Sequence, residues 1–595
     1  MDQLPLTCLL VVGFEGDAVR IQEQMALATE LAVQATGKEL GPGPGEHWFK
    51  HRYAVAFKLP KVFMQGAFAE TVEVAGLWRD VARIYHNVRN GVMGKVLLMA
   101  HFSHAYREGC SIYFTMSGYS KSPKGLLDKY DLTIRAILSR AMKAGATVSH
   151  HHGIGLMKRA FMEDEYRGGE RIFWAAKQAL DPACVLNPDK IYPSSVPFPA
   201  KPQAQEGGDL LDFHSVVYWE HQSRGVKEIT PEVPEEIPEI LRLAHDAGRV
   251  ICCQDTMNAT REACRGDRVS HMDLSRLDQI LELDPVSGTV TAQAGITMRQ
   301  LDNYLCEKGL SLGLVPKSKR AWLLGDYLAS TGPCEGSPLY GTLRENCIGL
   351  SAVLPDGSVF SARPCPRRAA GPDLMSCFLG AQGCYGIITA ACLRVFPLPA
   401  VSETLVYGIV DAELSVSAIR SILLKQSAPE WVIVGVRGGT NGGDGYRRAR
   451  MVFQFGGTRE AVSADMAVVR AVMTEVGATQ EATRADDRGN GGAKHPSIER
   501  FLPWRDIEEI LRRLSNDTTS ATPDALITDV TPQGAMLRLV CRDEAQTCPE
   551  DLAVLLATVL DPVLAAAALR LKEALDPNHV LNCKLVGDDE NGEGG

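Results

Sequence analysis

The segment KQALDPACVLNPDKI, Lys177 to Ile191, decides how this chain is organised, because it occurs a second time. Close to the C-terminus runs KEALDPNHVLNCKLV, Lys572 to Val586, and the two segments agree at eight of fifteen positions without gaps. In each copy helix-forming residues lead into Asp-Pro, which disfavours continuation of the helix. Coincidence is one explanation, since such stretches are common. Self-similarity over a helix end, a turn and the residues beyond instead predicts two domains of one type.

Length and composition limit the class of protein. A chain of 595 residues exceeds what one hydrophobic core usually serves, which predicts roughly two to four domains. Its 45% apolar and 23% charged residues are ordinary for a soluble globular protein. The net charge of −10 argues against a nucleic-acid partner and against binding to a broad anionic membrane surface.

The sequence also bears on the cellular compartment. No run of eighteen or more apolar residues occurs, so no transmembrane span is predicted. The start, MDQLPLTCLLVVGFEGD, has an acidic residue at once and no basic region, which argues against a signal peptide. The sixteen cysteines are scattered and form no CxxC pair, which indicates reduced thiols. We therefore expect a cytoplasmic protein, with peripheral attachment to a membrane left open.

Composition shifts divide the chain. The stretch PSSVPFPAKPQAQEGGD, 193–209, is rich in Pro, Ser, Gly and Gln and is typical of a linker. A Gly-rich stretch at 482–495 predicts a loop, and the acidic tail predicts disorder. The predicted order is a first domain at 1–197, a linker at 198–208, a second domain at 209–400, a third domain at 401–587 and a disordered tail at 588–595.

The first domain shows interleaved strand and helix patterns. Two strands, 96–106 and 109–119, are separated by a turn-like Arg-Glu-Gly, and the second alternates polar and apolar residues. A long amphipathic helix is predicted at 127–144, followed by Gly145 in a position that suits a helix end. Earlier, TCLLVVGF predicts a strand, and the helix that follows it is predicted at 21–37. This order is typical of a split βαβ sandwich.

The second domain has the pattern of an α+β fold. A helix closing at Gly248 is followed by the strand RVICC, 249–253. In TMRQLDNYLCEKG, Met298, Leu301 and Leu305 share one helical face, and Gly309 ends the helix. The Pro-Asp-Gly of LPDGSV predicts a hairpin turn.

Motifs of the second domain resemble those of flavin-linked oxidases of the vanillyl-alcohol-oxidase (PCMH) type. The series DLSRL, VTAQAGIT, PDG and GIIT follows the pattern of their FAD-binding domain over 235–399. HWFKHRYAVAF, MAHFSHAYREGCSIYF and SHHHGIG make the first domain similar to the substrate-binding cap of the alkyldihydroxyacetonephosphate synthase family. PRRAAGPDL, 366–374, is also more similar to that family than to lactate or glycolate dehydrogenases.

The resemblance implies the fold class α+β, with a PCMH-type FAD-binding domain flanked by two ferredoxin-like α+β cap domains. In that family the FAD-binding domain precedes the cap, and the cap closes with an Asp-Pro…Leu-Asn segment. This chain instead starts inside a cap. It is either a tandem duplication without its first FAD-binding domain or a permuted protein whose first cap covers the FAD-binding domain that follows.

The histidine triplet is the strongest local signal for chemistry. Read as a short strand, the triplet would put His150 and His152 on one face and His151 on the other. The resemblance makes all three candidates for catalysis and nominates His152 as acid and base, Tyr113 as a catalytic tyrosine and Arg52 as the phosphate-binding arginine. A metal site is the alternative, but strand geometry would separate the middle ring, so no metal ligand is predicted.

Two further histidines precede the triplet along the chain. His101 and His104 stand three apart on the strand predicted at 96–106, so they should face opposite sides. One of them is expected to line the pocket, and the other to lie on the surface or in the core.

The cofactor implied by the resemblance is FAD. The implied contacts are Pro316, Gly325, Asp326, Ser330, Gly380, Gln382, Gly383, Gly386 and Ile387. After the strand RVICC, however, no glycine stands where the family has three, and Asp255 would lie near two phosphates. Asp326 likewise replaces a glycine of the family pattern. We therefore expect a reduced hold on FAD by this chain.

Three functions follow from these expectations. The first is a flavin-dependent enzyme of ether-lipid synthesis, of the alkyldihydroxyacetonephosphate synthase type, that exchanges an acyl for an alkyl group on a lipid-like ketone phosphate. The second is an FAD-linked oxidase or dehydrogenase of a 2-hydroxy acid, with Arg52 on the carboxylate. The third is a flavin-poor pseudoenzyme or partner subunit that completes a site with a separate FAD-domain chain. A homodimer is also allowed, and no nucleic-acid partner is expected.

Overall fold

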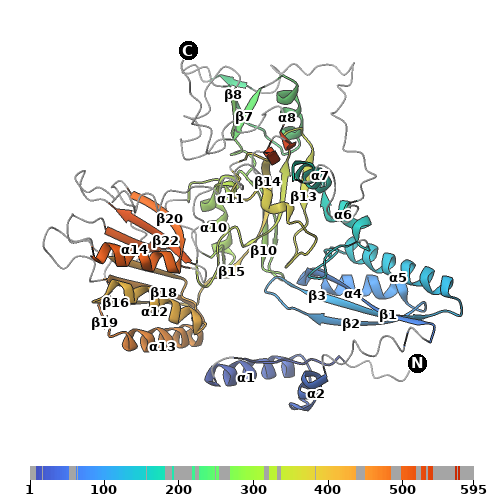
Figure 1. Ribbon diagram of the computed structural model, residues 1–595, viewed down its shortest axis with the longest axis horizontal. Coiled ribbons are helices and arrows are strands. Elements are labelled where there is room, and N and C mark those ends of the chain that lie inside the picture. The colour runs from blue at the N-terminus through green and yellow to red at the C-terminus, as the bar shows by residue number, and fades with distance from the viewer. Residues whose placement is uncertain are drawn as a thin grey trace. The chain divides into compact units, whose positions relative to one another are not determined.

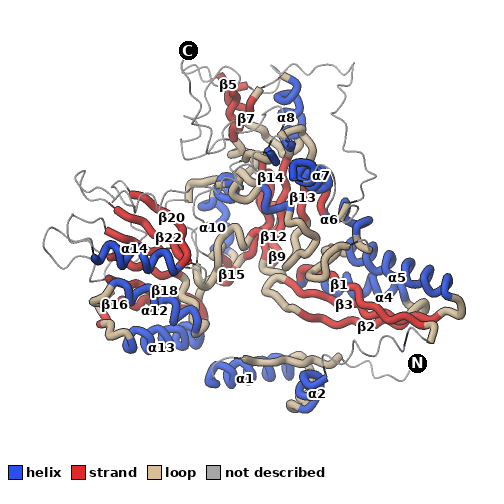
Figure 2. Tube along the Cα trace, in the orientation of Figure 1, coloured by secondary structure: helices blue, strands red, loops and turns tan. Residues whose placement is uncertain are grey.

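The structure is a computed structural model of the chain (Figures 1 and 2). It describes residues 8–15, 18–51, 62, 65–155, 157–180, 191–192, 218–220, 227–247, 249–253, 269–313, 320–330, 337–381, 383–436, 449–483, 497–516, 524–528, 530, 534–540, 570–572 and 574–576. The chain forms two compact units. Unit 1 comprises Met1–Val72, Arg89–His101 and Tyr113–Ile137, and unit 2 comprises Glu73–Val88, Phe102–Ile112 and Leu138–Gly595.

The N-terminal part of unit 1 is helical. Helix α1 spans Ala18–Gln34 and helix α2 spans Gly43–His51. The strand predicted in TCLLVVGF is wrong for its described residues, since 8–15 form no strand. Leu9 and Leu10 are exposed there, and no strand among the described residues pairs with this segment, so its backbone has no ladder to join.

The first domain is built on a three-stranded sheet. Its strands and helices are β1 (Ala67–Leu77), α4 (Trp78–Val92), β2 (Leu97–Ser103), β3 (Gly109–Tyr119) and α5 (Pro123–Lys143). The strand order is β1-β3-β2, and an isolated antiparallel bridge joins Ala75 to Thr147 beyond α5. The alternation predicted for β3 is confirmed, because Ile112, Phe114 and Met116 are fully buried.

The predicted helix and strand ends of the first domain are partly confirmed. Helix α5 begins four residues before the predicted 127 and ends at Lys143, one residue before the predicted end. Gly145 follows with φ +99°, a value that favours glycine. Strand β2, however, ends at Ser103, not at the predicted Tyr106. His104 has φ +47°, which turns the chain out of the strand, so the prediction that His101 and His104 share one strand is wrong.

The second domain contains a four-stranded sheet, a six-stranded sheet, one pair of short strands and several short helices. The smaller sheet has the order β5-β6-β8-β7, with β5 (Tyr218–Glu220), β6 (Lys227–Ile229), β7 (Val250–Cys253) and β8 (Val269–Met272). Helix α8 (Glu236–Asp246) lies between β6 and β7 in the sequence. The larger sheet has the order β4-β13-β12-β14-β10-β9, with β9 (Ile280–Asp284), β10 (Thr289–Gln293), β12 (Cys347–Val353), β13 (Val359–Ala362) and β14 (Ile387–Arg394). The remaining elements are α10 (Met298–Glu307), β11 (Leu310–Ser311), α11 (Leu324–Ala329), η4 (Leu374–Cys377) and β15 (Phe396–Pro397).

The end of the first domain joins the larger sheet of the second domain. Its elements are η2 (Arg159–Phe161), α6 (Met162–Glu165), β4 (Tyr166–Arg167) and α7 (Gly169–Leu180). Strand β4 pairs with β13, Tyr166 opposite Ala362, so a segment of the first domain forms the edge of this sheet. Ion pairs support the same junction within unit 2, including Arg394 with Glu108 at 2.6 Å.

The third domain repeats the topology of the first. Its elements are β16 (Val401–Ile409), α12 (Ala412–Leu424), β17 (Trp431–Val436), β18 (Ala449–Gly457), α13 (Arg459–Glu475), β19 (Thr479–Gln480), β20 (Ser497–Pro503), α14 (Trp504–Asn516), β21 (Asp524–Thr528) and β22 (Gly534–Val540). Strands β19-β16-β18-β17 have the ferredoxin-like order, and β21, β22 and β20 extend that sheet. In the first domain the Thr147 bridge, β1, β3 and β2 follow the same order. The predicted α+β fold class is confirmed.

The second closing segment returns to the second domain. Lys572 is buried, and its ammonium donates hydrogen bonds to the Cys384 carbonyl at 2.7 Å and to Asp576, which is fully buried. The linker predicted at 198–208 and the tail at 588–595 lie outside the described residues.

Truncation of Phe114 should destabilise the first domain, because its ring is fully buried in the sheet core. We expect Phe114→Ala to lower the free energy of unfolding by about 3–5 kcal/mol. Leu127→Ala on α5 is the control, since Leu127 is 69% exposed, and it should change that free energy by less than about 0.5 kcal/mol. Native-state hydrogen exchange of the β3 amides measures the free energy of unfolding of both variants. An equal decrease in Phe114→Ala and Leu127→Ala would contradict the burial of the Phe114 ring in the core.

Candidate active site

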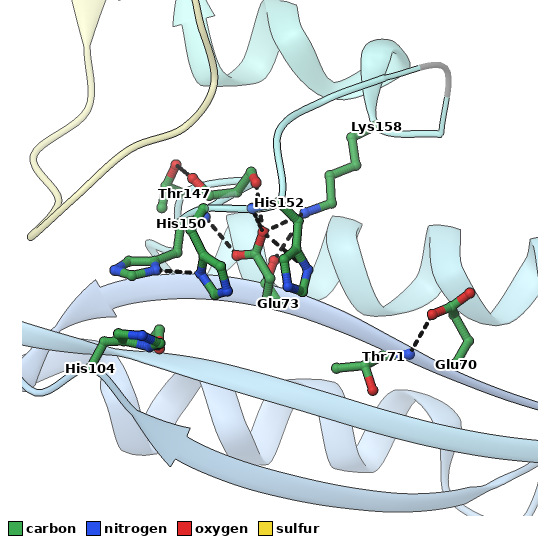
Figure 3. A network of polar contacts seen from close by, with 11 residues as sticks. Glu70, Thr71, Glu73, His104, Thr147, His150, His152 and Lys158 are labelled. Carbon is green, nitrogen blue, oxygen red and sulfur yellow. Dashed lines mark hydrogen bonds and ion pairs between the residues drawn. The ribbon is translucent and has the colours of Figure 1, made fainter. Parts of the chain in front are cut away.

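A buried carboxylate holds the histidine loop, which we define as residues 147–152. Glu73, near the end of β1, has no exposed surface and accepts a hydrogen bond from Ser149 Oγ at 2.6 Å. The backbone N–H groups of His150 and His152 donate to the same carboxylate at 2.6 and 2.9 Å (Figure 3). Lys158 Nζ lies 3.2 Å from Glu73 Oε1 and balances its charge. Glu73 therefore fixes the conformation of the histidine loop through these hydrogen bonds.

A second buried acid holds the start of the loop. Glu165 accepts hydrogen bonds from Thr147 Oγ1 at 2.6 Å and from the Val148 N–H at 2.8 Å. The Arg368 guanidinium donates to Glu165 at 2.8 Å and neutralises it. Charged hydrogen bonds between buried groups are stronger than neutral ones, so both ends of the loop are held in one conformation.

The histidine loop is not the strand predicted from the sequence. Residues 148–152 form bends, and His150 is buried whereas His151 and His152 are exposed. The predicted pairing of His150 with His152 on one face is therefore wrong. The physical reason is that the N–H groups of Val148, His150 and His152 bind carboxylates and not a neighbouring strand.

His104 joins the triplet in space, which the sequence did not predict. Its ring lies 5.0 Å from the His150 ring and 5.1 Å from the His151 ring, centroid to centroid. His150 Nδ1 lies 2.6 Å from His151 Nδ1, and His150 Nε2 lies 2.9 Å from the Tyr106 hydroxyl. An earlier end of this strand, with His104 in the turn that follows it, would have indicated the approach of His104. The sequence pattern instead predicted a continuous strand over 96–106.

Burial and mutual repulsion keep these rings uncharged. Burial, followed by the neighbouring His151 and His104 rings, lowers the pKa of His150 to about 4. Burial also lowers the pKa of His104 and of His151. Uncharged imidazoles at neutral pH can accept a proton or bind a cation.

The acid and the lysine beneath the loop carry opposite charges. Burial alone would raise the pKa of Glu73, but Lys158 and the hydrogen bonds from Ser149, His150 and His152 outweigh burial and lower it. Burial lowers the pKa of Lys158, and the charge of Glu73 opposes that shift. Glu73 and Lys158 therefore remain charged, because the opposite charge of each partner replaces the stabilisation that water would give to an exposed ion.

Tyr113 and Arg52 are the other residues predicted for the substrate site. Tyr113 is half-buried on β3, and its ring lies 5.5 Å from the His101 ring. Arg52 lies outside the described residues. The roles predicted for Tyr113, Arg52 and His152 stay predictions.

The described cofactor residues use their backbone groups within the fold. The Gly325 N–H donates to the Ala294 carbonyl at 2.8 Å, and the Gly380 N–H donates to the Leu328 carbonyl at 2.9 Å. The Ser330 N–H likewise donates to the Asp326 backbone carbonyl at 2.9 Å. These amides are therefore committed to protein partners, whereas a phosphate cradle needs amides that point at the ligand.

Packing explains the glycines that remain. A Cβ at Gly386 would lie 2.7 Å from the Phe378 ring, and one at Gly325 would lie 2.9 Å from the Ala294 side chain. Gly380 and Gly383 have φ +76° and +72°, which favour glycine. Ile387 is buried and pairs with Val353 in the sheet, so it serves the core. Pro316, Gln382 and Asp255 lie outside the described residues.

A carboxylate lies near the end of the strand that precedes the predicted phosphate loop. Burial and then the charge of Asp326 raise the pKa of the Cys253 thiol to about 12, so the Asp326 carboxylate lies near the end of β7. That strand end is where the family pattern places the phosphate loop. Two like charges at about 4 Å repel by about 1 kcal/mol in water and by about 4 kcal/mol at an effective dielectric near 20. A carboxylate near this strand end would therefore oppose the binding of the FAD pyrophosphate.

Membrane insertion through a helix finds no support in the described residues, where every helix is too short or too polar to span a bilayer.

Comparison with protein families identifies two domains. Residues 3–191 match the family of FAD linked oxidases, C-terminal domain, and residues 228–363 match the FAD binding domain family. The histidine loop lies within the first match, and Gly325 and Asp326 lie within the second.

Individual relatives match only part of the chain. The uncharacterized FAD-linked oxidoreductase YgcU of Escherichia coli (strain K12) is 33% identical over 160 residues, which are 27% of this chain and 33% of that protein. Alkyldihydroxyacetonephosphate synthase of Caenorhabditis elegans is 29% identical over 27% of each chain. D-lactate dehydrogenase [cytochrome] 1 of Saccharomyces cerevisiae (strain ATCC 204508 / S288c) is 28% identical over 32% of this chain and 34% of that protein. The chain thus spans about a third of the length of these relatives.

Replacement of Glu73 should weaken the histidine loop and change its response to acid. Its folded pKa is below its ordinary value of 4.5, so its charge contributes stability above that pH, and the contribution is lost as the pH falls through the folded value. Glu73→Gln should cost roughly 3–5 kcal/mol at pH 7, because it leaves Lys158 buried without its partner charge, and should flatten the acid dependence.

Hydrogen exchange of the loop amides at pH 7 and pH 4 measures both effects of Glu73→Gln. Glu70→Gln, on the same strand but half-exposed, is the matched control and should behave as the wild type. An acid dependence that is the same in Glu73→Gln and the wild type would show that Glu73 does not control the loop.

Replacement of Asp326 by asparagine should strengthen FAD binding. Removal of the negative charge relieves repulsion of the phosphates, so we expect the dissociation constant to fall roughly tenfold, equivalent to about 1.4 kcal/mol. Quenching of flavin fluorescence during titration measures the dissociation constant, with Asp278→Asn, an exposed site, as the control. A dissociation constant that does not fall would mean that Asp326 lies away from the phosphates.

Proposed function

Because this chain carries the C-terminal and FAD-binding domains of the FAD-linked oxidase family, we propose that it is an enzyme of that family that acts on a ketone phosphate. The reaction would be of the alkyldihydroxyacetonephosphate synthase type, in which an alkyl group replaces an acyl group. The similarity to alkyldihydroxyacetonephosphate synthase supports this proposal, as does the match of residues 3–191, which include the histidine loop, to the family of FAD linked oxidases, C-terminal domain.

The histidine loop is the observation that carries the proposal. Its backbone is held by two buried acids, Glu73 and Glu165, while the His152 side chain remains 46% exposed. His152 Nδ1 lies 3.7 Å from Glu73 Oε1, so a proton taken up by this ring would be stabilised by a neighbouring carboxylate. A rigid loop that presents an imidazole to solvent suits general acid and base catalysis.

In the proposed reaction His152 removes a proton from the carbon that lies between the ketone and the ester oxygen. The acyl group leaves as a carboxylate, which takes up the hydroxyl proton of the incoming long-chain alcohol as the alcohol oxygen bonds to that carbon, and His152 then returns its proton to the carbon. Glu73 holds the backbone of His152 in place through the hydrogen bond that the His152 N–H donates to it. Arg52 would bind the phosphate and Tyr113 would donate a hydrogen bond to the substrate, in accordance with the family pattern.

The supply of the flavin is a separate part of the proposal. The committed amides of Gly325 and Gly380 and the charge of Asp326 support a site completed by a separate FAD-domain chain or by a second protomer. The insertion of β4 into the sheet of the second domain instead supports a permuted protein in which the first domain covers its own FAD-binding domain.

A 2-hydroxy acid is the alternative substrate. The similarity to a D-lactate dehydrogenase favours it, because that protein's name specifies a hydroxy acid. Here Arg52 would bind the carboxylate and His152 would remove the hydroxyl proton.

Loss of His152 should abolish turnover in either reaction. We expect His152→Ala to lower kcat about 10²–10⁴-fold, the usual contribution of a general acid or base. The assay supplies FAD with an acyl ketone phosphate and a long-chain alcohol, or with a 2-hydroxy acid, and identifies the product by mass spectrometry. His86→Ala, an exposed histidine on α4, is the matched control and should retain full activity.

The three candidate functions give different results in this assay. An alkyl ketone phosphate product supports the synthase reaction, and a 2-keto acid supports the alternative. No product from either substrate with added FAD would argue for a partner subunit. Unchanged turnover in His152→Ala would remove this residue from the mechanism.

A further inference from the structure

Three imidazole rings converge above the acid that holds the histidine loop. His104, His150 and His151 each offer a ring nitrogen, and these three nitrogens lie within 4.8 Å of one another. His104 comes from the turn after β2, and His150 comes from the histidine loop (Figure 3). His151 follows His150 in that loop. Neutral imidazole nitrogen is a common ligand of transition metals.

Hydrogen bonds orient two of the rings in the manner of metal ligands. His150 uses Nε2 for the Tyr106 hydroxyl at 2.9 Å, so its Nδ1 is directed toward His151 Nδ1. His104 uses Nδ1 for Ser111 Oγ at 3.3 Å, which makes Nε2 its ligand atom in our assignment. Ligating histidines typically bind a second group through the other nitrogen, which fixes tautomer and ring orientation.

The argument against a metal site from the sequence does not apply to the folded loop. A strand would have turned His151 away from His150, but the carboxylates of Glu73 and Glu165 bend the backbone so that both rings meet. The positive φ at His104 turns this residue out of β2 and toward the pair. The convergence is therefore built from separate segments of the chain.

The charges around the three rings are balanced. Glu73 favours a cation at this place, and Arg367 opposes one, since their charges act on all three rings in opposite directions. His104 and His151 are exposed, so an ion could reach the nitrogens from solvent. Three neutral nitrogen ligands match the protein part of an open zinc site, in which water or substrate completes the coordination.

We propose that His104, His150 and His151 together bind one divalent transition-metal ion, for which Zn²⁺ is the natural probe. This inference goes beyond the proposed function, because His152 is outside the ligand set and the binding requires neither flavin nor substrate. Within the histidine loop, His150 and His151 would then bind the metal, and His152 would remain available for proton transfer.

Metal titration of the full chain tests the proposal. The protein is purified without a polyhistidine tag, freed of metal by dialysis against a chelator, and titrated with Zn²⁺ by calorimetry. We expect about one ion per chain, with Co²⁺ as a second probe giving the visible absorption of a low-coordinate site. Binding of less than one ion per chain by the wild type would overturn the proposal.

Substitutions locate the ion. His104→Ala and His151→Ala remove exposed rings, so the fold should persist, and each should weaken Zn²⁺ binding at least about 100-fold. Tyr106→Phe removes the orienting hydroxyl and should weaken binding roughly 10- to 100-fold, the range for groups that orient a ligand. Near-UV circular dichroism verifies the fold of each variant.

His101→Ala is the matched control, since His101 is also exposed and lies only three residues before His104 on β2. It should bind Zn²⁺ as the wild type does. Equal weakening in His101→Ala and His151→Ala would assign the ion to another place and refute the site. The metal test measures binding and not turnover, so absence of Zn²⁺ binding would leave the proton-transfer role of His152 unaffected. Unchanged turnover in His152→Ala would likewise leave the metal site unaffected.

Discussion

A carboxylate without exposed surface, Glu73, determines what the histidine loop can do. It receives two backbone amides, a serine hydroxyl and the Lys158 ammonium, so the chain around it cannot adopt the regular pairing of a strand. Burial makes each of these bonds strong and makes the loss of any partner costly. The positions of the His150, His151 and His152 rings follow from this one ion pair.

The two ferredoxin-like domains show how one topology supports different chemistry. In the first domain the segment after the Thr147 bridge carries the histidine loop. In the third domain β19 has the same place in the strand order, but it is followed by Glu481, which forms an ion pair with Arg450 at 2.9 Å. The strand order is common to both because it depends on apolar faces, whereas the residues after the fourth strand are free to differ.

The FAD-binding domain has kept its fold and changed its cofactor surface. Gly325 and Gly386 remain because a side chain there would collide with neighbouring atoms, which is a requirement of packing. Asp326 stands next to Gly325, at a position where the resemblance implies a second glycine. Fold and cofactor binding therefore respond to different constraints, and a family match over 228–363 reports mainly the first.

The sequence alone determined those features that depend on neighbours along the chain. The period-two alternation of β3 and the apolar face of α5 follow from local spacing, and each predicted an element that the structure contains. The conformation of the histidine loop and the approach of His104 were decided only by the tertiary structure. The physical reason is that the acceptor of the loop amides, Glu73, stands more than seventy residues earlier in the chain, so no local pattern could reveal it.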